Sequence, residues 1–371
     1  CSSIWILFFK HKKPSGVWIM SYTNGLDKPS DYFTTKLYTG NGSTQTISSV
    51  GFQPDWTWIK HRNGATAHML FDSVRGALYR LQSNSSNTQT SAANTLTSWN
   101  SDGFALGTEN DTNGNGRLFA SWNWLAGTSF TNDASSTGIG SLDSSGTVNE
   151  TAGFSIVKYT GNGSSGATIK HGLSTAPTAM FVRVYDAAAG FQVYNVGTGN
   201  TKFASYLNTT EAAGTTAGAW NNTTPTSSVF TVGNGGNTNN NGGTHIAYIF
   251  SERQGFSKFG VYKGNGQSSD GTYVHLGFKP AWVMIKITDN ASQDWFVLDN
   301  KRSPFNLVDE SLAPNQADTE YTSEANLDFL SNGFKLKMSS IRVNGSGNEY
   351  SYYAFAENPF VTSTGVPTTA R

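Results

Sequence analysis

The stretch GFQPDWTWI at residues 51–59 places a proline directly before an apolar run. The stretch GFKPAWVMI at residues 277–285 repeats this pattern, and GLSTAPTAMFV at residues 172–182 is a looser copy. Proline is tolerated at the start of a strand, where its missing N–H does least harm. The residues that follow are apolar without strict alternation, which is typical of a strand buried on both faces. The sequence therefore predicts three buried strands of one kind.

Two further landmarks recur in the same order around these strands. An aromatic strand and a Gly-Asn-Gly turn come before each proline, at residues 36–42, 158–163 and 261–266. A hairpin dipeptide follows later at 101–104 and 331–334, whereas the middle copy has only Val229-Phe230. Aromatic closing strands end the copies at 119–122, 246–250 and 353–356. Ordered landmarks at a matched spacing predict an internal repeat.

The repeat predicts an all-β chain of three tandem units, each resembling a β-sandwich or jelly roll. The second and third units nearly abut, so we expect them to pack together or to sit rigidly in line. The full division comprises a leader at 1–30 with a true start at Met20, unit 1 at 31–127, a Ser/Thr/Gly-rich linker at 128–152, unit 2 at 153–252, unit 3 at 253–360 and a C-terminal tail at 361–371.

Composition narrows the functional classes. Charged residues make up 13% of the chain and the net charge is zero, which argues against a nucleic-acid partner because phosphate binding needs a basic surface. The apolar run Ile4–Phe9 is too short to span a membrane, so no membrane partner is expected. The single cysteine, Cys1, excludes an internal disulfide.

One polar pattern follows the repeat. A basic residue lies six positions after each proline, and an Asp or Asn lies a further twelve or thirteen positions on. The pattern fits either a repeated ligand site or a buried pair that bridges neighbouring strands, and we favour the buried pair because a charge in a core strand usually has a partner. The residues are Lys60, Arg183 and Lys286, followed by Asp72, Asn195 and Asp299.

No catalytic, cofactor-binding or metal-binding residue is predicted. The carboxylates are scattered, and Gly42-Ser43 and Gly163-Ser164 lie in turns of the repeat rather than in a nucleophile elbow. His61 and His68 do not have a zinc-site spacing, and His171 and His275 are expected at strand edges. The Asn/Gly-rich stretches 110–116 and 233–243 are either binding loops or plain solvated loops.

The chain resembles a family of virion proteins that is common in marine bacteriophages. The resemblance is carried by SKFG at 257–260, GFKPAWVMIK at 277–286, LSNGFKL at 330–336, YAFAENPF at 353–360, GFQPDWTWI at 51–59 and LFDSVRGA at 70–77. It implies a structural or tail-associated protein and carries over no catalytic residue.

The resemblance and the repeat lead to one functional hypothesis with two alternatives. We expect a non-enzymatic virion protein on the surface of a bacteriophage particle, made in the host cytoplasm and used in a tail fibre or host-attachment appendage. The expected partners are other copies of the chain, such as a trimer, other virion proteins and a host surface glycan. The alternatives are a capsid decoration or filament-forming subunit, and a carbohydrate-binding, lectin-like module.

Overall fold

The computed structural model describes residues 10–12, 18–20, 23, 25–199, 205–214 and 217–368. The prediction of an all-β chain is confirmed, because antiparallel strands form nearly all of its regular structure. The helices are single turns in connections: η1 (Pro29–Asp31), α1 (Asn110–Asn113), α2 (Ala134–Thr137), η2 (Val196–Thr198), α3 (Ala217–Trp220) and α4 (Gly236–Asn239). The leader expected at 1–30 lies largely outside the described residues, except for a pairing of β1 (Lys10–Lys12) with β2 (Trp18–Met20) and the segment from 25 onward.

Below, units 1, 2 and 3 denote residues 31–127, 153–252 and 253–360. Unit 1 contains β3 (Phe33–Thr39), β4 (Gln45–Ile47), β5 (Trp56–His61), β6 (Met69–Asp72), β7 (Tyr79–Gln82), β8 (Thr90–Ser91), β9 (Leu96–Asn100), β10 (Gly103–Leu106) and β11 (Leu118–Trp124). Unit 2 contains β14 (Phe154–Thr160), β15 (Ala167–Lys170), β16 (Ala179–Val184), β17 (Gln192–Asn195), β18 (Ser205–Tyr206), β19 (Val229–Val232) and β20 (Thr244–Phe250). Unit 3 contains β21 (Ser257–Lys263), β22 (Tyr273–His275), β23 (Phe278–Ile287), β24 (Phe296–Asp299), β25 (Val308–Leu312), β26 (Tyr321–Leu330), β27 (Gly333–Leu336) and β28 (Glu349–Pro359).

The large sheet has the same strand order in each unit. The opening strand pairs with the closing strand, and the closing strand pairs with the proline-led strand. The proline-led strand pairs in turn with the strand that follows it in the chain. These orders are β3-β11-β5-β6, β14-β20-β16-β17 and β21-β28-β23-β24. A smaller layer covers one face of each large sheet. In units 1 and 2 it is a separate sheet, β4-β10-β9 or β15-β19, whereas in unit 3 the large sheet itself continues through β25 into β26-β27-β22. A separate apolar cluster fills each interlayer space.

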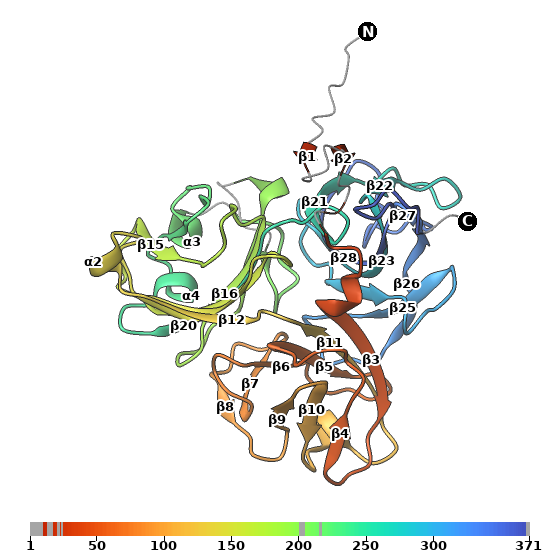
Figure 1. Cartoon of the computed structure of the whole chain (residues 1–371). Coiled ribbons are helices and arrows are strands. Elements are labelled where there is room, and N and C mark those ends of the chain that lie inside the picture. The colour runs from red at the N-terminus through yellow and green to blue at the C-terminus, as the bar shows by residue number, and fades with distance from the viewer. Residues whose placement is uncertain are drawn as a thin grey trace.

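The opposite faces of the three large sheets meet at the centre of the molecule (Figure 1), where they bury one shared aromatic core. The Trp56 ring stacks on Trp124 of the same unit with centroids 4.4 Å apart, and on Tyr248 of unit 2 at 4.3 Å. Trp282 and Phe355 of unit 3 close the cluster. The units therefore surround a common centre, whereas the sequence led us to consider an arrangement in line.

Residues 128–152, which were expected to be a linker, form part of a sheet. β12 (Thr128–Asn132) and β13 (Ser144–Asn149) form a hairpin-like pair, and β13 continues the large sheet of unit 2 by pairing with β14. The Ser/Thr-rich composition misled the prediction because an edge strand exposed to solvent can be polar. The C-terminal tail contacts the segment that precedes η1, since Ser363 N donates to Asp27 Oδ1 at 2.6 Å.

Candidate functional site

The repeated basic residues are fully buried and connect neighbouring units. Each projects from a proline-led strand and donates a hydrogen bond to a backbone carbonyl of another unit. One bond runs from unit 1 to unit 3, one from unit 3 to unit 2 and one from unit 2 to unit 1. Burial lowers the pKa of Lys60 and of Lys286 to about 8. The bonds are Lys60 Nζ to Ala317 O at 3.3 Å, Lys286 Nζ to Thr210 O at 3.2 Å and Arg183 Nη2 to Asn87 O at 2.6 Å.

The repeated acidic residues pair with a different base from the one we expected. Asp72 Oδ2 accepts from Arg75 Nε at 2.5 Å, and Asp299 Oδ2 accepts from Arg302 Nε at 2.6 Å, with all four side chains buried. The interpretation of a pair formed with the base of the preceding strand was therefore wrong, although both groups are buried as expected. The Asp-x-x-Arg spacing in the outer units was the sequence signal for these ion pairs, and it was missed.

These Asp and Asn side chains also bridge the units in a closed ring. Tyr248 Oη of unit 2 donates to Asp72 Oδ2 of unit 1 at 2.7 Å, and Trp122 Nε1 of unit 1 donates to Asp299 Oδ2 of unit 3 at 3.0 Å. In the third boundary, Asn195 Nδ2 of unit 2 donates to the Tyr352 carbonyl of unit 3 at 3.2 Å. The repeated polar residues thus hold the units together.

Each Gly-Asn-Gly segment is held by hydrogen bonds to one asparagine of a later loop in the same unit, and we call this contact the latch. In unit 1, the buried Asn113 accepts from Asn41 N at 3.0 Å and donates to Gly107 O at 2.8 Å. A Cβ on Gly40 would lie 2.3 Å from the Gly114 oxygen, and Gly42 has φ of +68°, so both glycines are required. Asn239 and Asn344 make the equivalent bonds in units 2 and 3. These contacts give the loops at 110–116 and 233–243 a structural role.

The histidines of the repeat are held as neutral rings. His171 Nδ1 accepts from Leu173 N at 3.2 Å, and His245 Nε2 accepts from Asn240 N at 3.1 Å. Burial lowers the pKa of each to about 4. His171 directly follows β15 and is buried, whereas His275 is the last residue of β22 and is exposed. Within the described residues, no group of three or more His, Cys, Asp or Glu side chains is placed to hold a metal ion.

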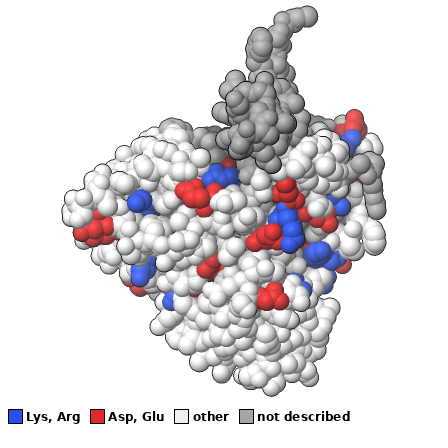
Figure 2. Space-filling model, in the orientation of Figure 1, with Lys and Arg blue, Asp and Glu red and all other residues white. Residues whose placement is uncertain are grey.

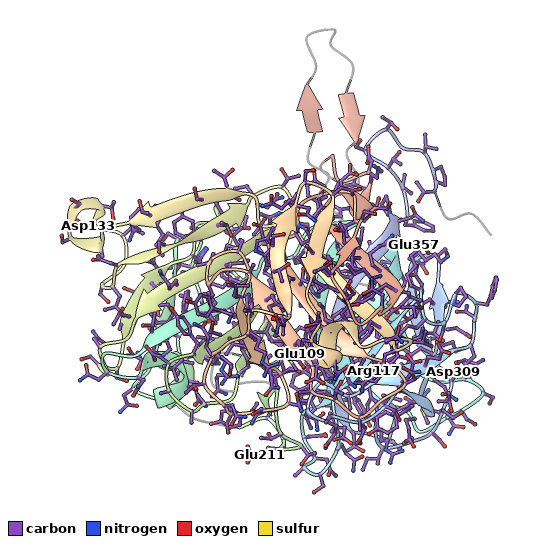
Figure 3. The ribbon with its side chains drawn as sticks, turned by 90° about the horizontal axis from the view of Figure 1, so that it is seen from below. Glu109, Arg117, Asp133, Glu211, Asp309 and Glu357 are labelled. Atoms are coloured by element: carbon purple, nitrogen blue, oxygen red, sulfur yellow. The ribbon has the colours of Figure 1, made fainter. Side chains whose placement is uncertain are left out.

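Charged groups are sparse on the face drawn in Figure 2, and large areas carry none. The carboxylates Asp133, Glu211 and Asp309 lie far apart around the molecule (Figure 3). Phe305 is the most exposed of the large hydrophobic side chains among the described residues, at 78%. The charged and exposed apolar groups of the described surface are thus scattered. The candidate site is therefore a concave feature of the molecule.

Such a feature is a pocket of about 250 Å³ at the boundary of units 1 and 3. Phe33 and Thr35 of β3 form one wall, and Asn300 in the turn after β24 and Ala356 of β28 contribute from unit 3. The pocket reaches the surface at Ser49, which is exposed. The sequence had not indicated any of these residues as part of a site.

The fold and this pocket define an all-β protein of three large sheets interlocked around one core. The chain belongs to the family of the domain of unknown function DUF7483, whose model matches residues 28–359. No curated protein matches the chain, and no solved structure matches it. None of the helices in the described residues is both long enough and apolar enough to cross a membrane.

Proposed function

We propose that the chain is a non-enzymatic structural protein of a bacteriophage particle, used in a tail fibre or another appendage that attaches the particle to its host. Its partners are further copies of itself, other virion proteins and a host surface glycan. The proposal rests on the resemblance of residues 51–59, 70–77 and 257–360 to phage virion proteins.

One structural observation supports a mechanical role. The polar residues that recur in every unit are buried and bonded across unit boundaries, in a ring that passes through all three units. Each of these hydrogen bonds contributes about 0.5–3 kcal/mol net, with the largest values for charged groups, so together they oppose separation of the units. A particle appendage needs such a body because it must keep its shape outside the cell.

Immunogold electron microscopy of purified particles tests this role. An antibody against the chain should label the tail or its fibres, and unlabelled particles with label confined to the lysate would overturn the proposal. Copy number per particle separates the alternatives, since tens of copies fit a fibre and hundreds fit a capsid decoration. Release of reducing sugar from host polysaccharide by the purified chain would contradict the non-enzymatic assignment.

A further inference from the structure

One position of the repeat carries an amide in unit 1 and a carboxylate in the other two units. Asn63, Asp186 and Asp289 each stand three residues after the buried base of the proline-led strand. In each unit this side chain accepts a hydrogen bond from the backbone N–H of the first residue of the closing strand. The bonds are Leu118 N to Asn63 Oδ1 at 3.0 Å, Thr244 N to Asp186 Oδ2 at 2.8 Å and Glu349 N to Asp289 Oδ2 at 2.8 Å. The fold therefore accepts either side chain here.

Asn63 is followed by a glycine. An asparagine before glycine is prone to lose its amide, because glycine has no side chain to hinder attack by its own backbone nitrogen on the asparagine side chain. Asn63 is exposed and Gly64 is half-buried, so water has access to the pair. A Cβ on Gly64 would lie 2.0 Å from His61 Cε1, and the position is thus restricted to glycine.

The backbone N–H of Gly64 is free to react. Among the described residues, none accepts a hydrogen bond from it. In the three Gly-Asn-Gly segments, by contrast, the N–H of the second glycine is held by the latch. These bonds are Gly42 N to Asn113 O at 2.8 Å, Gly163 N to Asn239 O at 3.1 Å and Gly266 N to Asn344 O at 2.8 Å. The nitrogen that must attack is therefore bonded in those segments and unbonded at Gly64.

The amide oxygen of Asn63 is held by two donors. Besides Leu118 N, His61 Nε2 lies 2.9 Å from Asn63 Oδ1. Burial lowers the pKa of His61, and its Nδ1 is buried without a partner among the described residues, so the ring is neutral and carries its proton on Nε2. Donors placed in this way stabilise the negative charge that develops on a carbonyl oxygen when a nucleophile attacks its carbon. The side-chain carbon of Asn63 is thus activated for attack.

We propose that Asn63 is a site of spontaneous deamidation, at which the chain converts with time to the aspartate that units 2 and 3 already carry. The Gly64 nitrogen attacks Asn63 Cγ, so that an N–Cγ bond forms and the Cγ–Nδ2 bond breaks. The proton of Gly64 passes through solvent to the leaving group, which departs as ammonia and leaves a succinimide ring. One water molecule then opens the ring at either carbonyl and gives aspartate or isoaspartate.

The two products have different structural consequences. Aspartate keeps the bond from Leu118 N, as Asp186 and Asp289 do in their units. Isoaspartate lengthens the main chain by one carbon in the connection between β5 and β6. In that connection Gly64 O accepts from Lys60 Nζ at 3.3 Å, and the same ammonium group bonds to Ala317 O of unit 3. Isoaspartate should therefore loosen the bridge between units 1 and 3. The inference goes beyond the virion role and does not depend on it.

Peptide mapping by mass spectrometry of the purified full chain, incubated at neutral and at mildly alkaline pH, tests this site. Trypsin cuts after Arg62 and Arg75, so Asn63 is the sole asparagine of its peptide, as Asn41, Asn162 and Asn265 are of theirs. A sample digested without incubation corrects for deamidation during digestion. Asn63 should deamidate about tenfold faster than the other three, since tenfold corresponds to ~1.4 kcal/mol, about the net value of one hydrogen bond.

Two variants complete the test. His61→Phe removes the Nε2 donor but keeps a ring against Phe119, and it should slow deamidation at Asn63 by about tenfold while the rate at Asn41 stays unchanged. Asn63→Asp should melt at the same temperature as the native chain, whereas the isoaspartate form, separated by chromatography, should melt at a lower temperature.

A rate at Asn63 no higher than at Asn41, Asn162 and Asn265 would overturn the inference. A rate that His61→Phe leaves unchanged would overturn it as well, because the two donors would then have no part in the reaction. Circular dichroism establishes that the variant is folded, and the comparison of sites within the native chain decides the matter if it is not. A large loss of melting temperature in Asn63→Asp would show that the fold does not accept the product.

Discussion

Trp122 and Asp299 lie 177 positions apart in the sequence, yet the indole N–H of the first donates to the carboxylate of the second at 3.0 Å. The same tryptophan ring carries the Arg302 guanidinium over its face, 5.6 Å from the ring centroid. One side chain of unit 1 therefore completes a buried ion pair of unit 3. A contact of this kind makes the folding of one unit depend on the presence of another.

Removing the hydroxyl of Tyr248 should weaken the boundary of units 1 and 2. Tyr248→Phe deletes a bond to the buried carboxylate of the Asp72–Arg75 ion pair, and bonds to charged groups contribute about 1.5–3 kcal/mol. Tyr353→Phe is the matched control, because Tyr353 stands at the equivalent position next to the neutral Asn195. Urea denaturation should show a loss of about 2 kcal/mol for the first variant and under about 1 kcal/mol for the second. Equal losses would contradict the assigned role of the carboxylate.

Breaking the Asp72–Arg75 pair should cost more than replacing it as a whole. Arg75→Thr leaves a buried carboxylate without its cation and should lower the free energy of unfolding by about 3–5 kcal/mol. The double variant Asp72→Asn with Arg75→Thr copies Asn195 and Thr198 of unit 2, where no charge is buried at this position. The double variant should therefore unfold at a higher urea concentration than the single variant. The reverse order would show that the ion pair is not the dominant interaction.

The Gly-Asn-Gly latch predicts a strong effect of one amide group. Asn113→Asp replaces a donor of three hydrogen bonds by an acceptor that faces three oxygen atoms. We expect a loss of about 3 kcal/mol or more, since several buried acceptors lose their partner. Asn115→Asp, on an exposed residue of the same loop, is the control for added charge and should stay within about 0.5 kcal/mol. Differential scanning calorimetry of both variants distinguishes the two outcomes.

Stability should fall as the pH is lowered from 6.5 to about 4. Burial lowers the pKa of His171 and of His245 from 6.5 to about 4, so in this window the unfolded chain binds protons that the folded chain does not. The free energy of unfolding has its full value above pH 6.5. By pH 4, protonation of each histidine in the unfolded chain lowers this free energy by up to about 3 kcal/mol.

His245→Phe isolates this effect from the carboxylates that titrate in the same range. Phenylalanine is compatible with the site, because Phe119 takes the equivalent position in unit 1, where it stacks on Tyr38 as His245 stacks on Tyr159. The difference in unfolding free energy between pH 7 and pH 4.5 should be smaller in the variant than in the native chain. An identical difference in both proteins would contradict the assignment to His245.

The sequence was informative wherever the determining contacts are local or periodic. The prolines at 54, 177 and 280 located the central strands, and apolar patterning identified an all-β chain. The latch was visible only as a recurring turn, because its partner Asn113 lies 72 positions from Asn41. The repeated basic and acidic residues were expected to pair with each other, but the basic residues bond to carbonyl groups of other units, and no spacing rule connects Lys60 to Ala317.

The pocket was beyond sequence reasoning for a different reason. The difference between Thr35, Ile156 and Phe259 is visible once the repeats are aligned on their tyrosines. The sequence does not show that Thr35 lies beside a pocket, because a threonine in an edge strand is expected to be exposed to solvent until the neighbouring sheet is known to cover it. The pair β12 and β13 was missed on similar grounds, since β12 is an exposed edge strand and the Ser/Thr-rich composition of both strands is as common in loops.

Joining the three units in one polypeptide has a consequence for stoichiometry. Three identical subunits around an axis would be bound to carry the same residue at every boundary, so a pocket at one boundary would appear at all three. A single gene product can place threonine at residue 35 and larger apolar residues at 156 and 259. The molecule can thus keep a closed ring of buried contacts between its units while one boundary carries a pocket that the others do not have to share.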